Sequence, residues 1–245
     1  MHIKFFIQKT REVIDQSQKN IKLAIIDHIS SVPAVIFDIE QIIKFFRSQN
    51  ILTLIDGAHA IGSIPINLQQ MNPDCYLTNS HKWLFSHRSG CLLYVRKELQ
   101  TLISPITTSF GYKQGYQEEF KWLGTKDYSN YFTISDAIDF RQMIGGDMAI
   151  YEYNHQLAVN AGNLLESMWN SSTLTTNDEY IGFMNNVQLP LIINTTESRR
   201  NLYNKLIERY NIFLPSFQFD NKYYCRISAQ IYLELTDFEY VGNCV

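Results

Sequence analysis

Apolar and polar residues alternate along the first part of the chain in a pattern typical of a parallel α/β fold. Residues 4–18 carry apolar side chains at helical spacing among charged ones, which predicts an amphipathic helix. Short apolar runs at 21–26 and 51–55 predict buried strands. Between them, apolar residues recur every three to four positions after Asp38, which is a plausible N-cap. Strand, helix and strand in this order indicate neighbouring parallel strands.

The pattern changes character at about residue 150. Before that point we expect two more strands, at 74–78 and 91–95, and a longer helix over 135–150 that two glycines interrupt. The sequence therefore predicts a partial large domain over 1–150 with a parallel-rich sheet, and a small α+β domain over 151–245. The elements predicted for the small domain are helices at 151–169 and 197–210 and strands at 187–193, 212–214 and 223–228.

Composition limits the class of protein. The chain has 245 residues, of which 45% are hydrophobic and 18% charged, with a formal net charge of -3. This apolar content favours a globular fold over disorder. The near-neutral charge, without any basic run, disfavours a dedicated nucleic-acid binder. No apolar stretch approaches the roughly 20 residues that would span a bilayer, and the N-terminal apolar patch is too short for a secretory signal. We therefore expect a cytoplasmic protein.

The four cysteines are scattered, and no two of them form a C-x-x-C pair. This spacing disfavours a disulfide framework and a structural zinc site, so we expect no metal and four thiols, most of them buried. A reducing compartment fits this usage. The cysteines are Cys75, Cys91, Cys225 and Cys244.

Residues that could carry chemistry follow the predicted strands. Asp27, His28 and Asp56 stand where two strands end, the edge of a parallel sheet at which ligands bind. Lys82 follows the next predicted strand. A lysine amine near a strand-end carboxylate suits pyridoxal phosphate, which needs an amine for its Schiff base and a carboxylate beside its ring nitrogen. A lone loop lysine is also a common solvated charge, and a strand-end aspartate is often a turn former, so spacing alone leaves both interpretations open.

The segments around these residues resemble the cofactor-binding core of class V aminotransferase-fold enzymes, and the resemblance runs from roughly residue 5 to residue 240. It implies an α/β fold of type I (aspartate aminotransferase-like), pyridoxal phosphate as cofactor, an amino-acid substrate and a homodimer. Within that superfamily, HKW, WLGTKDYSNY and RISAQIY resemble the isopenicillin N epimerase-like branch, which is related to the cysteine desulfurases. The stretches that carry the superfamily resemblance are IIDHISS, LIDGAHAIGSIPINL and CYLTNSHKWLFSHRSGCLLYV.

The resemblance also implies roles for single residues. Lys82 matches the Schiff-base lysine, and Asp56 matches the carboxylate that pairs with the pyridine nitrogen. His59 stands where relatives place a Gln or His near the phenolic oxygen of the cofactor. Asn79 and His81 match the polar positions that hold the phosphate.

Three further residues come from more distant parts of the chain. Thr125 matches a residue that reaches the phosphate from the partner subunit, and Ser31 occupies a loop position where some relatives have an Asn facing the cofactor ring. Arg226 matches the arginine that holds the substrate α-carboxylate, for which its two-pronged guanidinium is suited. The alternative is a surface arginine at a strand edge with no role in binding. Strand alternation predicts that Cys225 points away from Arg226, into the small-domain core.

Two tryptophans flank these motifs. Trp83 follows the lysine and Trp122 precedes the Gly124–Thr125 turn, so both either line the mouth of the pocket or pack in the core.

The motifs leave the reaction open. Related cysteine desulfurases carry a mobile cysteine ahead of the arginine, and here the corresponding stretch, PSFQFDNKYY, has none. Sulfur transfer through a persulfide is therefore disfavoured. Epimerisation, elimination (a lyase reaction) and transamination remain, and all begin with removal of the α-proton, for which Lys82 is the candidate base.

The chain departs from the family pattern at its start. Full family members have an upstream segment with further strands, a phosphate-binding loop and a ring that stacks on the cofactor, so the sequence is expected to be truncated and to bind the cofactor poorly. Two hypotheses follow: the catalytic part of a pyridoxal-phosphate enzyme, or a truncated or degenerate non-catalytic homologue that keeps the fold as an assembly or regulatory module. Retention of Asp56, Lys82, Thr125 and Arg226 together favours the first.

Overall fold

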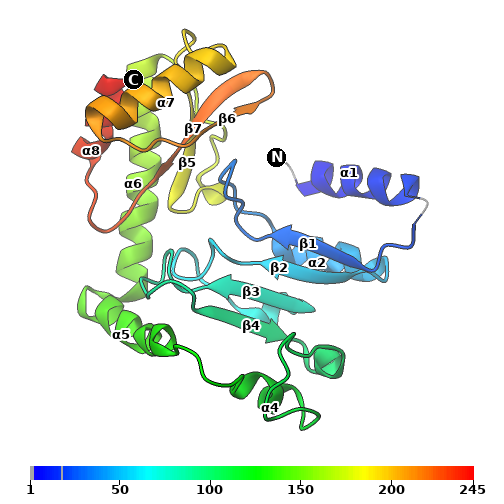
Figure 1. Cartoon of the computed structure of the whole chain (residues 1–245). Coiled ribbons are helices and arrows are strands. Elements are labelled where there is room, and N and C mark those ends of the chain that lie inside the picture. Colours follow the sequence, from blue (N-terminus) through cyan, green and yellow to red (C-terminus); the bar gives the residue numbers. More distant parts are fainter. Residues whose placement is uncertain (1–2, 18) are drawn as a thin grey trace. The chain divides into compact units, whose positions relative to one another are not determined.

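The contacts within the chain divide it into two compact units. The computed structural model describes residues 3–17 and 19–245 (Figure 1). The first unit comprises residues 1–28 and 37–140, and the second comprises 29–36 and 141–245. The chain therefore passes between the units three times. The division of the chain into two domains at residue 150 stays a prediction.

A four-stranded sheet forms the centre of the first unit. Its strands lie in the order β1 (Leu23–Asp27), β2 (Leu52–Asp56), β3 (Cys75–Asn79) and β4 (Cys91–Val95). The first three are parallel and β4 is antiparallel. The four predicted strands are confirmed to within two residues at each end. Asp27 is paired with Asp56 in the register, so the two carboxylates end neighbouring strands.

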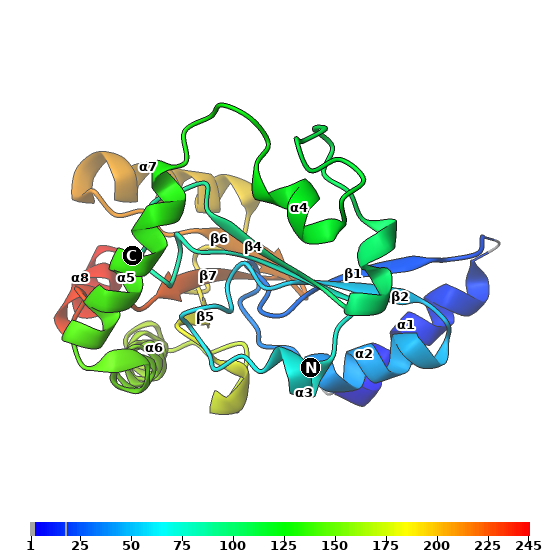
Figure 2. The same ribbon diagram turned by 90° about the horizontal axis from the view of Figure 1, so that it is seen from below.

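Helices cover the sheet of the first unit unevenly. Figure 2 shows α1 (Ile3–Gln16), α2 (Ile39–Ser48) and α3 (Leu68–Met71) on one side of the sheet and α4 (Tyr116–Lys121) on the other. The predicted N-cap of α2 is confirmed, because Asp38 Oδ1 accepts a hydrogen bond from the Gln41 amide at 3.1 Å. The predicted first helix ends at Gln16, and residue 18 lies outside the described residues.

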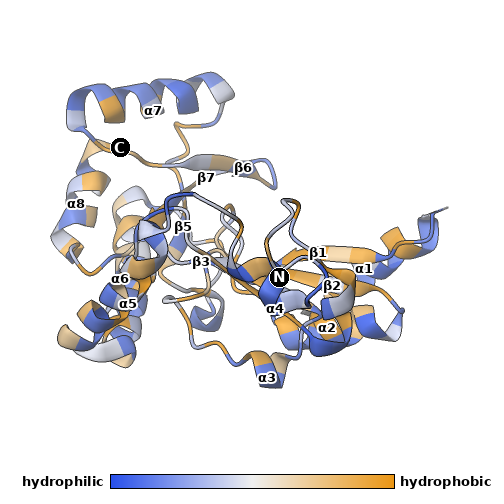
Figure 3. Ribbon diagram, turned by 60° about the horizontal axis from the view of Figure 1, so that its bottom comes forward, coloured by the Kyte–Doolittle hydropathy of each residue, from blue (hydrophilic) through white to orange (hydrophobic). Residues whose placement is uncertain are grey.

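The strands predicted to be buried are buried on one face only. Ile42, Ile43 of α2 and Ile55 of β2 are at most 1% exposed and form the core of the covered face. On the other face, Ile25 is 65% exposed, although Figure 3 shows β1 as one of the most hydrophobic segments. An apolar run of this kind indicates burial on both faces, and in β1 the described residues leave the face that carries Ile25 exposed.

The boundary between the two units at residues 140 and 141 lies within a helix. The helix predicted over 135–150 is two helices, α5 (Ser129–Met143) and α6 (Gly146–Trp169), the second of which also contains the helix predicted at 151–169. They are separated at Gly145, whose φ of 115° is a left-handed conformation that an L residue rarely adopts. The glycine pair therefore ends one helix and begins another.

The second unit is an α+β arrangement, as predicted. Its antiparallel sheet has the order β5 (Met184–Gln188), β7 (Lys222–Ser228), β6 (Ser216–Phe219), and it packs with α6, α7 (Thr196–Tyr210) and α8 (Leu235–Cys244). Short 3₁₀ helices lie at Lys97–Leu102 in the first unit and Asp178–Tyr180 in the second. The strand predicted at 187–193 begins three residues earlier and ends five residues earlier, and the strand predicted at 212–214 is wrong because β6 begins after Pro215.

The cysteines are all thiols, and their burial differs between the units. Cys225 is fully buried in the core of the second unit, as strand alternation predicts, and Cys244 is buried as well. Cys75 is half-buried and Cys91 is exposed, so the expectation of buried thiols holds in the second unit and not for Cys91 in the first. Among the described residues, no helix is long and apolar enough to cross a membrane. The same residues contain no group of three or more His, Cys, Asp or Glu arranged to hold a metal.

Candidate active site

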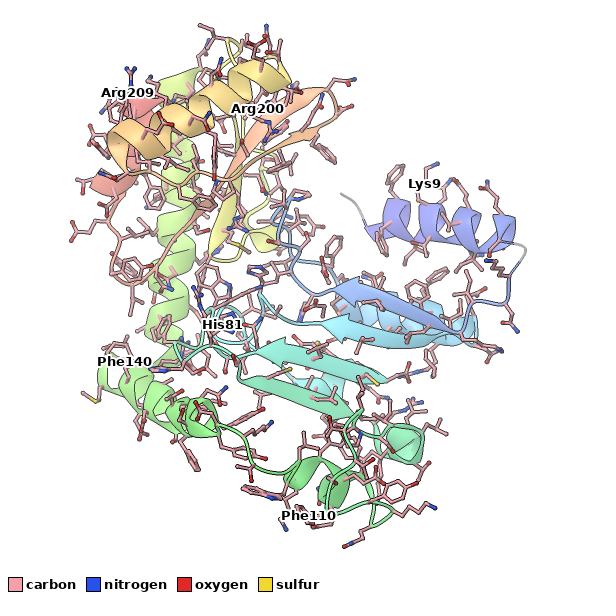
Figure 4. All side chains as sticks on the ribbon, viewed as in Figure 1. Lys9, His81, Phe110, Phe140, Arg200 and Arg209 are labelled. Carbon is pink, nitrogen blue, oxygen red and sulfur yellow. The ribbon has the colours of Figure 1, made fainter. Side chains whose placement is uncertain are left out.

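Two turns that follow neighbouring parallel strands bring Lys82 and His59 together. His59 follows β2 and Lys82 follows β3, and Lys82 Nζ lies 3.0 Å from His59 Nε2. Figure 4 labels His81, the neighbour of Lys82, beyond the end of β3. The contact follows from topology, because the carboxyl ends of parallel strands lie at one edge of a sheet.

Trp83 fixes the imidazole of His59 from the other side. The indole Nε1–H of Trp83 donates to His59 Nδ1 at 3.2 Å, and both side chains are at most 9% exposed. A neutral imidazole that accepts at Nδ1 carries its proton on Nε2. His59 therefore directs its Nε2 toward Lys82 Nζ, 3.0 Å away.

Two carboxylates stand beside this pair. Asp56 Oδ1 accepts a hydrogen bond from the Ala58 amide at 2.9 Å, which orients the carboxylate at the start of the turn. Burial and the negative charge of Asp56 raise the pKa of Asp27, and the nearby Lys82 partly offsets the rise. Asp27 thus lies within electrostatic reach of both Asp56 and Lys82, so two acidic groups and one amine share the sheet edge.

A buried histidine–tyrosine pair packs against the turn that follows Asp56. His28 Nδ1 lies 2.9 Å from the hydroxyl of Tyr76, and the two side chains are 6% and 2% exposed. Burial lowers the pKa of His28 to about 4, so the imidazole is neutral at physiological pH. A Cβ on Gly57 would overlap with the ring and hydroxyl of Tyr76, so the turn requires glycine for space. In the sequence, His28 is recognisable only as a strand-end residue, and Tyr76 gives no signal beyond that of an aromatic residue in β3.

The segment before the lysine holds polar atoms with and without partners. The Ser80 hydroxyl accepts from Ser86 at 2.7 Å and donates to the Gly90 carbonyl at 3.3 Å. Asn79 Oδ1 and His81 Nδ1 are buried and have no hydrogen-bond partner among the described residues. Buried polar atoms are rarely left in this state, so these two atoms are suited to a ligand that supplies the missing bonds.

Thr125 lies in the first unit, in an exposed turn between α4 and α5. The turn is shaped by Gly124, whose φ is 105°, and by a hydrogen bond from the Tyr128 hydroxyl to the Gly124 carbonyl at 2.8 Å. Trp122 stacks on Tyr128 with ring centroids 4.8 Å apart and is 49% exposed. The role of Thr125 stays a prediction.

Ser31 and Arg226 come together in the second unit. Arg226 Nη1 donates to the Ser31 carbonyl at 3.1 Å and to the Ser31 hydroxyl at 3.0 Å. Arg226 Nε is buried without a partner among the described residues, and burial lowers the pKa of the guanidinium. The arginine is therefore held by one of its nitrogens while another has bonding capacity left. The buried Nε distinguishes Arg226 from a freely solvated arginine, and its role in binding a ligand stays a prediction.

The predicted site residues thus fall into two groups and one separate residue. The first unit gathers Lys82, His59, Asp56, Asn79 and His81, and the second gathers Ser31 and Arg226. The profile of class V aminotransferases matches residues 5–194.

The chain belongs to the class V aminotransferase family. It is 33% identical over 231 residues to hercynylcysteine sulfoxide lyase of Schizosaccharomyces pombe, and the aligned region covers 90% of this chain and 57% of that protein. It is 28% identical over 262 residues to L-cysteine desulfhydrase of Arabidopsis thaliana, covering 98% and 58%. Isopenicillin N epimerase of Streptomyces clavuligerus is 25% identical over 228 residues, covering 86% and 56%. The chain thus spans less than two thirds of the length of these relatives.

Solved structures confirm the predicted fold. A cystine C–S lyase bound to cysteine persulfide has a TM-score of 0.77 at 18% identity, covering 96% of this chain and 63% of that one. A cysteine desulfurase from Thermococcus onnurineus has a TM-score of 0.75 at 17% identity, covering 97% and 61%. This class V chain therefore has the fold of the type I pyridoxal-phosphate enzymes, as expected from the motifs.

The first unit contains the groups that pyridoxal phosphate needs. Lys82 supplies an amine, Asp56 a carboxylate for a ring nitrogen, and His59 an N–H suited to a phenolic oxygen. The partnerless His81 Nδ1 can donate to a phosphate when it carries a proton, and Asn79 has an amide that can turn its NH₂ toward the same group. The donor set of this class V member therefore fits the cofactor.

Proposed function

We propose that the chain carries the lysine site of a pyridoxal-phosphate-dependent lyase that cleaves the carbon–sulfur bond of a sulfur-substituted amino acid. The observation that supports this most directly is the contact between Lys82 Nζ and His59 Nε2 at 3.0 Å, beside Asp56 at the same sheet edge. Sulfur chemistry is favoured over epimerisation because the hercynylcysteine sulfoxide lyase is 33% identical and the epimerase 25%.

In this proposal each residue of the lysine group has one task. Lys82 is the amine that anchors the cofactor and then, displaced by the substrate amine, the base that takes the α-proton. Asp56 keeps the ring nitrogen protonated, and His59 donates its Nε2–H to the phenolic oxygen. Asn79 and His81 bind the phosphate. Pyridoxal phosphate, when bound, supplies an electron sink that makes the α-proton acidic.

The chain's own residues support elimination without a sulfur carrier. The proton leaves the α-carbon for Lys82 Nζ, and the electron pair released there forms a carbon–carbon double bond as the bond from the β-carbon to sulfur breaks. The sulfur group leaves with the electron pair of that bond. No protein cysteine is needed for this step, and the stretch from Pro215 to Tyr224 contains none.

Arg226 and Ser31 are proposed to bind the substrate rather than to react with it. Arg226 Nε has unmet bonding capacity, and a guanidinium holds a carboxylate through parallel charge-assisted bonds. Arg226 therefore selects the α-carboxylate of an amino acid. Ser31, already bonded to Nη1, faces the same ligand.

We also propose that Thr125 acts across a homodimer interface. The exposed turn at Gly124 leaves Thr125 accessible, and relatives of this pattern are expected to use it in trans. Sizing chromatography with light scattering is expected to give a dimer when pyridoxal phosphate is bound. A cofactor-loaded monomer would contradict this assignment.

The lysine assignment is tested by absorbance. The purified chain mixed with pyridoxal phosphate is expected to develop a visible absorbance band that is lost in Lys82→Ala. Lys97→Ala, which removes an exposed lysine of the same unit, is the matched control and should keep the band. Far-UV circular dichroism verifies that both variants fold.

The same experiment separates the two functional hypotheses. A band that persists in Lys82→Ala would overturn the lysine site. A folded wild-type chain that develops no band would favour the non-catalytic assembly or regulatory module. Where the band is present, release of sulfide from L-cysteine, absent in Lys82→Ala, is the result expected for the lyase.

A further inference from the structure

The loop Ile29–Ile36 is built into the second unit by one buried amide. Asn186 in β5 is 1% exposed. Its Oδ1 accepts from the Ala34 amide at 2.9 Å, and its Nδ2 donates to the Ala34 carbonyl at 2.8 Å. The side chain thus meets both backbone groups of one residue, as a neighbouring strand would. A further backbone bond, from the Ile36 amide to the Tyr180 carbonyl at 3.0 Å, holds the end of the loop.

The same asparagine stands opposite Arg226. In the antiparallel register of β5 and β7, Asn186 is paired with Arg226, so the two side chains lie on one face of the sheet. Arg226 Nη1 reaches the carbonyl and hydroxyl of Ser31, three residues before the Ala34 that Asn186 holds. These contacts form a closed circuit. Hydrogen bonds link Asn186 to Ala34 and Arg226 to Ser31, the chain links Ala34 to Ser31, and strand pairing links Arg226 to Asn186.

This circuit determines where the guanidinium lies. A long, flexible arginine side chain loses rotamer entropy when it is fixed in one geometry. Ser31 fixes it by accepting two hydrogen bonds at Nη1, and the Ser31 position in turn depends on the bonds at Ala34. The Nε that is left without a partner is oriented by the same contacts.

We propose that Asn186 is a positioning residue for substrate recognition, which sets the carboxylate-binding geometry of Arg226 through Ala34 and Ser31. The inference rests on the proposed role of Arg226 in binding the α-carboxylate. Asn186 acts through the loop and is not itself a catalytic residue.

A matched control lies next to Asn186 in the same strand. Asn185 is 2% exposed and points to the opposite face, where its Nδ2 donates to the Ala158 carbonyl at 3.2 Å. Asn185→Ala removes a buried amide from the same strand, including the acceptor of the Asn186 backbone amide at 2.8 Å, but it removes no bond to the loop. Comparing it with Asn186→Ala separates a loss of positioning from a loss of stability.

The first readout does not depend on the cofactor. In a chain labelled with ¹⁵N-arginine, the Nε–H signal of Arg226, assigned by its absence in Arg226→Lys, is expected to be sharp and protected from exchange. Asn186→Ala should raise its exchange rate at least tenfold, and Asn185→Ala should leave it within twofold. An unchanged rate in Asn186→Ala would overturn the proposal.

The second readout uses the cofactor-loaded protein and two probes. L-Alanine has an α-carboxylate and L-alaninamide does not, and neither carries a sulfur leaving group. We expect Asn186→Ala to weaken L-alanine binding about tenfold and to leave L-alaninamide binding unchanged. If Arg226→Lys fails to reduce the preference for L-alanine, the carboxylate role in the proposed function is wrong. If Arg226→Lys reduces it and a folded Asn186→Ala does not, only the positioning role is wrong.

A milder variant keeps the test decisive if Asn186→Ala does not fold. Ser31 is exposed, so Ser31→Ala removes one of the two acceptors of Nη1 at little structural cost. It should shift both readouts in the same direction as Asn186→Ala, by about two- to threefold. No shift in either readout would contradict the circuit.

Discussion

The lysine group of the first unit and the arginine group of the second unit are organised in opposite ways. Around Lys82, side chains from two strand-end turns converge, and buried atoms of Asn79 and His81 have no partner among the described residues. Around Arg226, the loop backbone already occupies Nη1, and Asn186 satisfies both polar groups of Ala34. The first group is arranged for a ligand that supplies hydrogen bonds, whereas the second is held by the chain itself.

The difference shows where each group is vulnerable. The lysine group depends on tight turns at strand ends. Substitutions that enlarge a residue packed against these turns, such as Gly57 against Tyr76, should therefore disturb it most. The arginine group depends on a hydrogen-bonded circuit, so removal of one amide should disturb it most. Four predictions test this contrast.

The largest effect is expected from Gly57→Ala. The added methyl group would displace the buried Tyr76 ring and break its bond to His28, at a cost of about 3 kcal/mol in the free energy of unfolding. Urea unfolding measures the loss, and the visible cofactor band should weaken in parallel. A native-like midpoint and band would contradict the steric requirement.

Gly162→Ala is the counterpart in the second unit. A Cβ there would overlap with the amide of Asn185, so a similar loss of stability is expected. At a temperature well below its unfolding midpoint, this variant should keep the cofactor band that Gly57→Ala loses. Equal loss of the band in both variants would show that the two groups are not independent.

The second prediction concerns the pH dependence of stability. Burial lowers the pKa of His28 from 6.5 to about 4, so the unfolded chain binds its proton more readily than the folded chain. Stability from this residue is therefore present above pH 6.5 and is lost as the pH falls toward 4, by about 3 kcal/mol. His28→Asn should have a flatter dependence over this window, measured by urea unfolding. His87→Asn, which replaces an exposed histidine, should follow the wild-type curve.

The third prediction concerns the proton on His59. Trp83→Phe removes the donor to Nδ1, at a cost of about 1 kcal/mol, and should allow a mixture of imidazole tautomers. Long-range ¹H–¹⁵N correlation spectra distinguish the tautomers through their nitrogen shifts. The wild type should show a protonated Nε2 alone, and a protonated Nδ1 in the wild type would refute this arrangement.

The last prediction concerns the rates at which the thiols react, and it involves no change in the stability of the protein. Cys91 is exposed in the first unit and should react with iodoacetamide first. Burial raises the pKa of Cys225 to about 12, so in the folded protein it should react at least 100-fold more slowly. Peptide mass mapping measures both rates. Early labelling of Cys225 would mean that the core of the second unit opens readily.

The sequence predicted the lysine group better than the arginine group, for a physical reason. Asp56 ends a strand, and His59 and Lys82 follow strands. Local apolar runs predict these strands, and the parallel topology brings the residues after them to the same edge of the sheet. The bond between Ser31 and Arg226 joins residues 195 apart in the chain, and no local pattern encodes it. The resemblance to the family suggested both residues but not their contact.

The errors in the predicted elements have local causes. The strand β5 contains Asn185 and Asn186, buried polar residues that interrupt the apolar run from which a strand is predicted. The apolar residues Ile212 and Leu214 pack against the core of the second unit without forming a strand, because pairing with β7 begins only at the Pro215 carbonyl, which accepts from the Arg226 amide at 2.9 Å. Burial of β1 was overpredicted because alternate residues of an apolar run can face an uncovered side of a sheet.

The loop Ile29–Ile36 has a consequence for the order in which the protein is made. Its partners Asn186 and Arg226 follow Ala34 and Ser31 by 152 and 195 residues. At typical rates of synthesis, the loop waits on the order of ten to forty seconds for them to emerge from the ribosome. During that time its backbone is exposed to water and to other chains. The second unit therefore cannot be finished before the last strand is translated, however early its first eight residues were made.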